Sequence, residues 1–150
     1  MRRVVVSAHA ADRMRGEMKR HRRTETGGVL VGRMDGDSLM VVDASDPGPR
    51  AKRRMLSVVI DGIYAQQFCD AARNKSANEI DYVGDWHCHL AWTCKPSPAD
   101  QEAMRIMADF ADSPTKTPIS LIWAKYRNSF RTYLFTLDRT LQVVPHVILE

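Results

Sequence analysis

The sequence predicts a mixed α/β (α+β) fold, in which a β-sheet is sandwiched by helices. Three segments carry apolar residues at helical spacing, and they alternate with segments rich in β-branched and aromatic residues. The chain has 150 residues, 44% of them hydrophobic and 27% charged, a balance typical of a globular protein. Because this length suffices for one hydrophobic core, we expect a single domain over residues 1–150.

The chain is predicted to begin with a strand and a helix. Arg2–Ser7 has the apolar character of a short strand, and its last residue, a serine, is placed to cap the helix that follows. That helix is expected over Ala8–Arg20, where Ala11, Met14 and Met18 share one face.

A β-hairpin and a loop follow. Strands over Glu25–Met34 and Leu39–Ala44 flank the turn Asp35–Asp37, which favours a hairpin. The proline- and glycine-containing segment Asp46–Pro49 and the basic run Arg50–Arg54 predict a polar flap, outside the core.

Two further helices are predicted, with another strand between them in the sequence. The second helix is expected from Asp61 to Asn74, and the third from Pro98 to Ala111, with a proline in its first turn. Asp81–His89 between them is predicted to be a strand that ends in a loop. The residues expected to face inward are Ile63, Tyr64, Phe68, Ala71 and Ala72 in the second helix and Ala103, Met104, Met107 and Ala111 in the third.

The last part of the chain is predicted to consist of strands. Ile119–Trp123, Ser129–Leu137 and Leu141–Ile148 are rich in β-branched and aromatic residues. Tyr126–Asn128 and Asp138–Thr140 separate them as turns.

Composition narrows the class of protein. No apolar run approaches the roughly 20 residues needed to cross a bilayer, and no signal peptide is recognisable, so we expect a cytoplasmic protein without a membrane partner. The three cysteines lack the spacing of a disulfide framework or a zinc knuckle. The charge of +4 is mildly basic, but no aromatic interleaving accompanies the basic runs, so nucleic acid is not the expected partner.

Two histidines are positioned to share a metal ion. His87 and His89 lie two residues apart on the predicted strand, so both point to one face with Cβ atoms roughly 6 to 7 Å apart. A catalytic zinc site needs a third protein ligand and leaves its fourth position to water. A third ligand is therefore expected close by.

Ser97 and Asp100 follow the histidines, giving the pattern H-x-H-x7-S-x2-D. The segment from Trp86–His89 to Ser97–Asp100 resembles the signature of the JAB/MPN (JAMM) zinc metalloprotease family. That family also has a glutamate on a separate upstream strand, in a run of the form E-x-x-G-x-L-x-G, which Glu25–Gly32 matches. Two separate motifs therefore agree.

The resemblance implies a role for each matching residue. His87, His89 and Asp100 would hold Zn²⁺, Glu25 would act as the base, and Ser97 would stabilise the oxyanion. It also implies a cytidine-deaminase-like arrangement of sheet and helices. A zinc deaminase itself is disfavoured, because its H-x-E and P-C-x-x-C motifs are missing.

Some residues depart from the pattern or allow simpler interpretations. Cys88 stands where serine or threonine is commoner in the family, and Leu90 where proline often follows. We expect Cys88 to pack on the opposite face. Ser97–Asp100 alone is also an ordinary helix start, and an isolated H-x-H is more often part of a core. The remaining histidines, His9, His21 and His146, are expected to be surface or packing residues. Cys94 lacks the oriented base that a thiol protease needs.

The resemblance implies an activity and partners. The protein would cleave after the C-terminal glycine of a ubiquitin-like protein or its conjugate, in a bacterial antiphage system of CBASS type that also contains activating- and conjugating-enzyme homologues and their targets. The Asp46–Ser57 loop is the predicted contact for the body of that partner. Alternatives are trimming of a sulfur-carrier protein's tail and a non-catalytic scaffold role.

Overall fold

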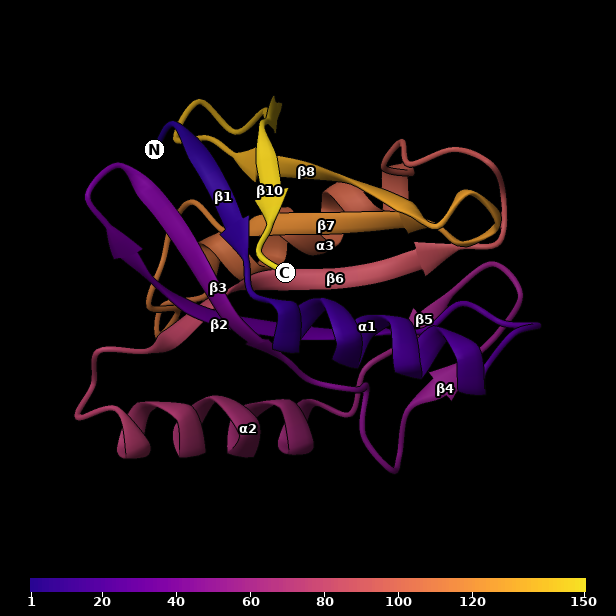
Figure 1. Cartoon of the computed structure of the whole chain (residues 1–150), viewed down its shortest axis with the longest axis horizontal. Coiled ribbons are helices and arrows are strands. Elements are labelled where there is room, and N and C mark those ends of the chain that lie inside the picture. Colours follow the sequence, from indigo (N-terminus) through magenta and orange to yellow (C-terminus); the bar gives the residue numbers. More distant parts are fainter.

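An eight-stranded mixed sheet is the framework of the protein, in the strand order β10-β1-β3-β2-β6-β7-β8-β9 (Figure 1). The structure is a computed structural model that describes residues 1–150. The strands of this sheet are β1 (Arg3–Val6), β2 (Gly27–Asp35), β3 (Ser38–Ala44), β6 (Asp81–His89), β7 (Ile119–Ala124), β8 (Ser129–Phe135), β9 (Leu141–Val144) and β10 (His146–Ile148). The other elements are α1 (Ala8–Arg20), β4 (Lys52–Arg53), β5 (Val58–Val59), α2 (Gly62–Lys75), α3 (Pro98–Asp109) and the 3₁₀ turn η1 (Lys125–Arg127).

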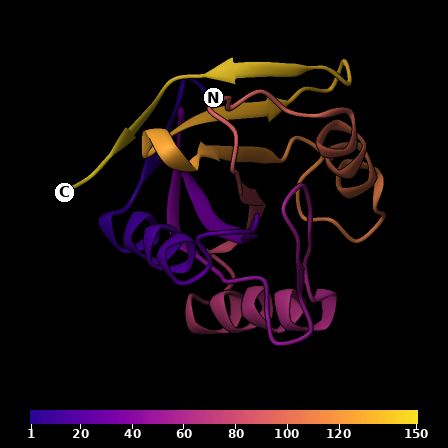
Figure 2. The same ribbon diagram turned by 90° about the vertical axis from the view of Figure 1, so that its right-hand side faces the viewer.

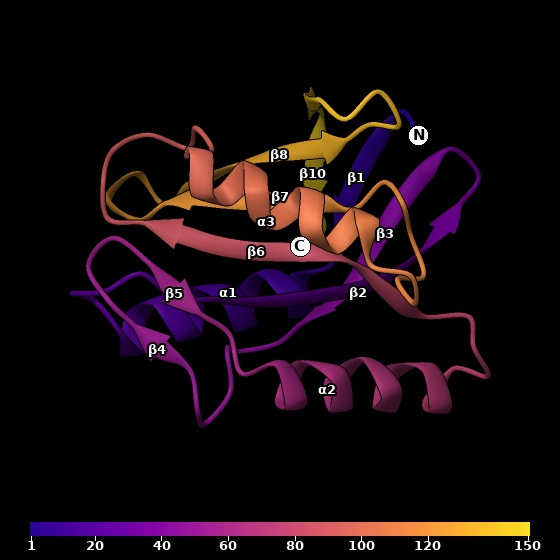
Figure 3. The same ribbon diagram turned by 180° about the vertical axis from the view of Figure 1, so that it is seen from behind.

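Helices cover both faces of the sheet, as predicted. Helix α1 lies on one face, and α2 and α3 lie on the other (Figures 2 and 3). The main core lies between α1 and the sheet and contains the fully buried Met14, Trp86 and Trp123. A smaller apolar cluster joins α2 to β2 and β6 through Val31 and Cys69. The sandwich predicted from the sequence is confirmed.

The start of α1 agrees with the sequence prediction. Ser7 is the N-cap, and its Oγ accepts a hydrogen bond of 3.0 Å from the backbone N–H of Ala10. Met14 and Met18 are buried on the expected face, but so is the carboxylate of Glu17, only 2% exposed. Apolar periodicity could not predict a charged residue on this face.

The inward faces predicted for α2 and α3 are partly wrong. Ile63 is 68% exposed, and Cys69 is the one buried residue of α2. In α3 the buried residues are Met104 and Ala108, whereas Ala103 is exposed. Ala71 and Ala111 are also exposed. The reason is that each helix contacts the sheet along a narrow stripe, which leaves an apolar groove between α2 and α3.

The predicted strand Leu141–Ile148 is in fact two strands. Pro145 has no N–H group for a ladder and separates them: β9 pairs antiparallel with β8, whereas β10 pairs parallel with β1 at the other end of the sheet order. The sheet is therefore strongly curved. His146 stacks on Phe130 with ring centroids 4.0 Å apart, which confirms that it is a packing residue.

The prediction of a polar flap outside the core is wrong in part. Pro47 and Gly48 are buried, and the Pro47 carbonyl accepts a hydrogen bond of 2.8 Å from the Asp61 N–H at the start of α2. The segment continues into the antiparallel hairpin β4–β5. Local composition did not reveal this anchoring, because the partners are distant in sequence: Asp61 at the start of α2, and Glu17 in α1, which pairs with Arg53.

In the whole chain, none of the helices is long and apolar enough to span a membrane.

Candidate metal centre

The histidine pair lies at the end of β6, a central strand between β2 and β7. Side chains alternate along the strand, so Trp86 and Cys88 enter the α1 core, where both are buried. His87 and His89 point to the opposite face. Their Nε2 atoms are 3.1 Å apart, and the prediction that Cys88 is a packing residue is confirmed.

Asp100 completes the cluster from the first turn of α3. Its Oδ1 lies 3.2 Å from His87 Nε2, and its Oδ2 lies 3.1 Å from His89 Nε2. A capping box holds this carboxylate: Ser97 N–H donates to Oδ2 at 2.7 Å, and Ser97 Oγ accepts from the Asp100 N–H at 3.1 Å. The same hydrogen bonds that start the helix therefore orient Asp100.

The three donor groups fit a zinc ion. Two imidazole nitrogens and one carboxylate oxygen form a donor set that suits zinc, and ligands about 2.0 Å from a tetrahedral ion stand about 3.3 Å apart. The two Nε2 atoms are 3.1 Å apart, and each lies 3.1 to 3.2 Å from a different oxygen of Asp100. One donor atom from each residue can be chosen so that all three lie within 4.8 Å of one another. The Thr93 carbonyl lies 3.3 Å from His89 Nδ1 and can only accept, so it places that ring's proton on Nδ1 and leaves the Nε2 lone pair for a metal.

The charges of the cluster also favour a cation. Burial by itself would raise the pKa of Asp100, but hydrogen bonds from His87 and His89 outweigh burial and hold this pKa well below its usual range. The hydrogen bond to Asp100 raises the pKa of His89. The carboxylate is thus ionised at neutral pH, as metal binding requires.

Glu25 lies beside the cluster, just before β2. The β2–β6 ladder pairs Gly27 with His87, and the Cys88 N–H donates to the Thr26 carbonyl at 3.0 Å, so the same register places Glu25 opposite His89. Glu25 is only 7% exposed, and burial raises its pKa although the two histidines oppose this shift. The structure therefore brings together all five residues predicted from the sequence: Glu25, His87, His89, Ser97 and Asp100.

Gly27 makes room for this arrangement. A Cβ atom at this position would lie 2.4 Å from the Trp86 carbonyl oxygen and 2.9 Å from His87 Cβ. A side chain here would push β2 away from β6. Glycine is thus needed for the close approach of the strand that follows Glu25 to the strand that carries the histidines.

One acidic residue near the site was missed by the sequence prediction. Asp85 lies two residues before His87 on the same face and accepts a hydrogen bond of 3.3 Å from the Tyr82 hydroxyl. Burial raises its pKa to about 6. It lines a groove of about 570 Å³ between α2 and α3, which also contains Val59, Ile106 and other apolar residues. Strand alternation from His87 would have been the signal that finds it.

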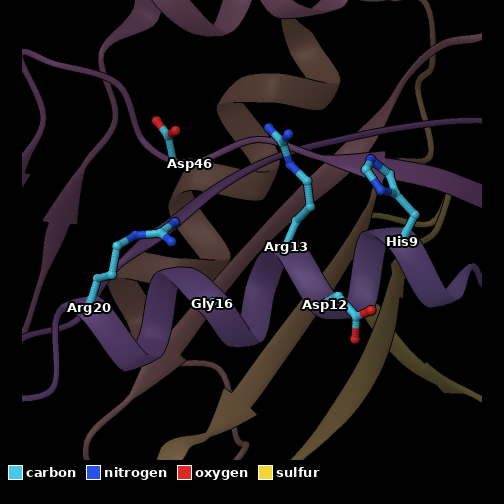
Figure 4. Close-up of a pocket in the computed structure, with 6 residues that line it drawn as sticks. All are labelled: His9, Asp12, Arg13, Gly16, Arg20 and Asp46. Atoms are coloured by element: carbon cyan, nitrogen blue, oxygen red, sulfur yellow. The ribbon is translucent and has the colours of Figure 1, made fainter.

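The remaining histidines and Cys94 are not part of the donor cluster. His9 pairs with Asp43 at 3.1 Å, and Cys94 Sγ contacts a backbone carbonyl at 3.8 Å. A polar cavity of about 350 Å³ lies against the outer face of α1 (Figure 4). Its lining is His9, Asp12, Arg13, Gly16, Arg20 and Asp46. Basic and acidic groups balance there, so this cavity has no marked preference for a charged ligand.

A comparison with known protein families identifies the family. The family of prokaryotic homologs of the JAB domain matches residues 7–133, which include all five residues of the site. The chain belongs to the prokaryotic JAB family. The resemblance noted from the two motifs is thereby confirmed, and the site residues of this JAB protein occupy one contiguous region at the carboxyl end of β6.

Individual relatives of this JAB protein carry a functional name. It is 33% identical over 103 residues to the CD-NTase/cGAS isopeptidase of Vibrio cholerae serotype O1, covering 68% of this chain and 66% of the relative. With the CD-NTase/cGAS isopeptidase of Escherichia coli it shares 31% identity over 87 residues, covering 57% of this chain and 56% of the relative. The matched region thus spans less than two thirds of the length of either relative.

A solved structure shares the fold of this JAB protein. The solution structure of a protein from Desulfitobacterium hafniense superimposes with a TM-score of 0.69, covering 98% of this chain and 93% of the other. Sequence identity is 18%, so this likeness concerns the fold alone.

Proposed function

We propose that this protein is a zinc-dependent isopeptidase that cleaves after the C-terminal glycine of a ubiquitin-like protein joined to its target. The observation that carries the proposal is the convergence of His87, His89 and Asp100, with the buried Glu25 opposite them. The name shared by the bacterial relatives, CD-NTase/cGAS isopeptidase, supports isopeptide hydrolysis. We propose an antiphage setting for it, as the family resemblance implies. We also propose that residues 1–150 form one domain that carries the whole site.

Each residue of the site has its own role in the proposed reaction. His87, His89 and Asp100 would hold a zinc ion, which would lower the pKa of water to near 7 and polarise a carbonyl. Glu25 accepts a proton from the attacking water and returns it to the departing amine, a contribution typically worth about 10² to 10⁴ in rate. Burial suits this role, because a raised carboxyl pKa brings the base closer to neutral pH. The Thr93 carbonyl orients the His89 ring through Nδ1, and the Ser97 N–H orients the Asp100 carboxylate.

Ser97 is proposed to stabilise the oxyanion. Its oxygen accepts from the Asp100 N–H, which leaves the hydroxyl proton available to a substrate carbonyl. Ser97→Ala is expected to lower kcat by about 10²-fold, as for the loss of one oxyanion donor, and to cost about 1 kcal/mol of stability through the lost N-cap. Enzyme kinetics and thermal unfolding measure the two effects. Ser97→Thr is the control, and a kcat of Ser97→Ala within twofold of wild type would exclude the oxyanion role.

The groove between α2 and α3 is the proposed place for the substrate tail. Strand β5 pairs only with β4, so its other edge is free, and Val58 and Val59 line the groove. An extended tail ending in two glycines can add to this edge as a further strand and lead to the metal centre, because Asp85 in the groove neighbours His87. Leu56 in the β4–β5 turn is 87% exposed, which supports its contact with the body of the ubiquitin-like partner.

The deciding experiment uses three substrates made from one ubiquitin-like protein. In the first its terminal glycine is joined to a lysine side chain, in the second a short peptide follows its Gly-Gly end, and the third is a folded linear fusion. Intact mass is measured with and without a chelator. Cleavage of the lysine conjugate that stops with chelator and returns with Zn²⁺ is expected.

The other outcomes identify the alternatives. Release of the short peptide without cleavage of the lysine conjugate would indicate trimming of a sulfur-carrier tail. Absence of cleavage in all three substrates, together with a protein purified without zinc, would contradict the proposal and favour a scaffold role. Activating- and conjugating-enzyme homologues supply the lysine conjugate in the proposed setting.

A further inference from the structure

Helix α1 buries a carboxylate that the proposed reaction does not use. Glu17 is 2% exposed, on a face whose other buried members are alanine and methionine residues. Removing a carboxylate from water is costly, and a buried ion pair is often no more stabilising than apolar residues of the same volume. Packing alone therefore does not explain why a glutamate occupies position 17.

The partners of Glu17 come from two distant segments. Arg53 in β4 donates to Oε1 from Nη2 at 2.7 Å and from Nε at 3.1 Å, and the Thr26 hydroxyl donates to the same oxygen at 2.8 Å. Arg53 Nε also lies 3.2 Å from Thr26 Oγ1, which closes a triangle of contacts. The end of α1 adds weaker contacts from Arg20 at 3.4 Å and His21 at 3.6 Å.

Each partner is connected to Glu25 through the backbone. Thr26 directly follows Glu25, and its carbonyl accepts the hydrogen bond from Cys88 between the two histidines. Arg53 directly precedes Arg54, whose carbonyl accepts the Glu25 N–H at 2.7 Å. The backbone of Glu25 is thus fixed on one side through Thr26 and on the other through the hairpin, and both attachments lead to Glu17.

We propose that Glu17 is a positioning residue for Glu25 and that it acts through Thr26 and Arg53. The buried ion pair fixes the backbone around the base and holds the β4–β5 hairpin in register with it. This inference rests on the proposed function, since it assigns Glu17 to the reaction in which Glu25 is the base. Glu17 itself lies on the α1 side of the sheet and does not contact substrate.

The test separates positioning from packing. In the double variant Glu17→Met/Arg53→Met both charges are removed together, so no unpaired charge remains buried and the melting temperature is expected to stay within about 5 °C of wild type. The zinc content is expected to be unchanged. The kcat for cleavage of the lysine conjugate is expected to fall at least about 10-fold, since misplacement of a catalytic group by 1 Å can cost about 10². A role limited to packing would leave kcat unchanged at this stability.

Hydrogen–deuterium exchange provides a readout that needs no activity. Backbone amides of residues 23–26 and 52–59 are expected to exchange at least about 10-fold faster in the double variant, whereas those of β7 keep their protection. The matched control is Asp109→Asn/Arg139→Gln, which removes an exposed ion pair of 2.7 Å that joins α3 to the turn after β8. This control is expected to match wild type in kcat and in exchange of both segments.

The two readouts distinguish failure of this inference from failure of the proposed function. Wild-type kcat and wild-type exchange in a folded double variant would overturn the inference. If the double variant does not fold, Thr26→Val, which removes one hydroxyl at nearly constant volume, decides by the same two readouts. If the wild-type protein cleaves none of the substrates, the proposed function fails, and unchanged exchange of residues 23–26 would still refute the positioning of Glu25 by Glu17.

Discussion

Glu25→Gln is expected to lower kcat for conjugate cleavage by about 10² to 10⁴-fold and to leave the zinc content at the wild-type level. Glutamine has nearly the volume of glutamate and can stay in the same buried position, but it cannot accept a proton from water. The metal ligands in β6 and α3 do not change, because Glu25 belongs to neither element. Kinetics of the lysine conjugate and metal analysis of the same preparation test the two parts.

A stability measurement serves as the control for this substitution. Burial raises the pKa of Glu25, so in the metal-free protein its stabilising contribution is complete below the unfolded carboxyl pKa and is lost as pH rises through the higher folded value. The metal-free Gln variant is therefore expected to gain stability relative to wild type as pH rises above about 4, the ordinary carboxyl pKa. Cleavage by the variant at the wild-type rate would show that another group is the base.

His87→Ala is expected to abolish both zinc binding and cleavage. It removes one of three donor groups whose ligand atoms lie within 4.8 Å of one another, and alanine offers no replacement ligand. Activity is expected to equal that of the chelated wild type. Because a ligand that binds only the folded state raises its stability, added Zn²⁺ should raise the melting temperature of wild type but not that of the variant.

His9→Ala is the matched control for His87→Ala. His9 lies on α1, is largely exposed and pairs only with Asp43, so its replacement should preserve zinc content and kcat. Metal analysis after gel filtration compares the two variants. One zinc per chain in His87→Ala would contradict the assignment of the metal ligands.

Much of the fold could be predicted because local chemistry decides it. Ser7 before α1, Asp61 before α2 and Ser97 before α3 each accept a backbone hydrogen bond at a helix start. The alternation of side chains on β6 separated His87 and His89 from the buried Cys88. These features depend on residues adjacent in sequence, so short windows contain them.

The faces of α2 and α3 could not be predicted in the same way. Ile63 satisfies the apolar periodicity of α2 but is exposed, because the neighbouring sheet covers only part of that helix. Asp85 lies on the same face as the histidines, yet its place in the groove depends on helices that are distant in sequence. Apolar periodicity shows which residues can be buried, not which of them meet a partner.

By itself, the sequence determined the family, the order of the helices and most strands, and the five residues of the candidate site. It did so because spacing and capping are local properties of the chain. Only the tertiary structure decided that Glu25 lies opposite His89, that Pro145 sends the chain from β9 to the far edge of the sheet, and that Glu17 pairs with Arg53. Each of these depends on strand register or on contacts between distant segments. A buried charged group needs a partner, and that partner can come from a part of the chain far away in sequence.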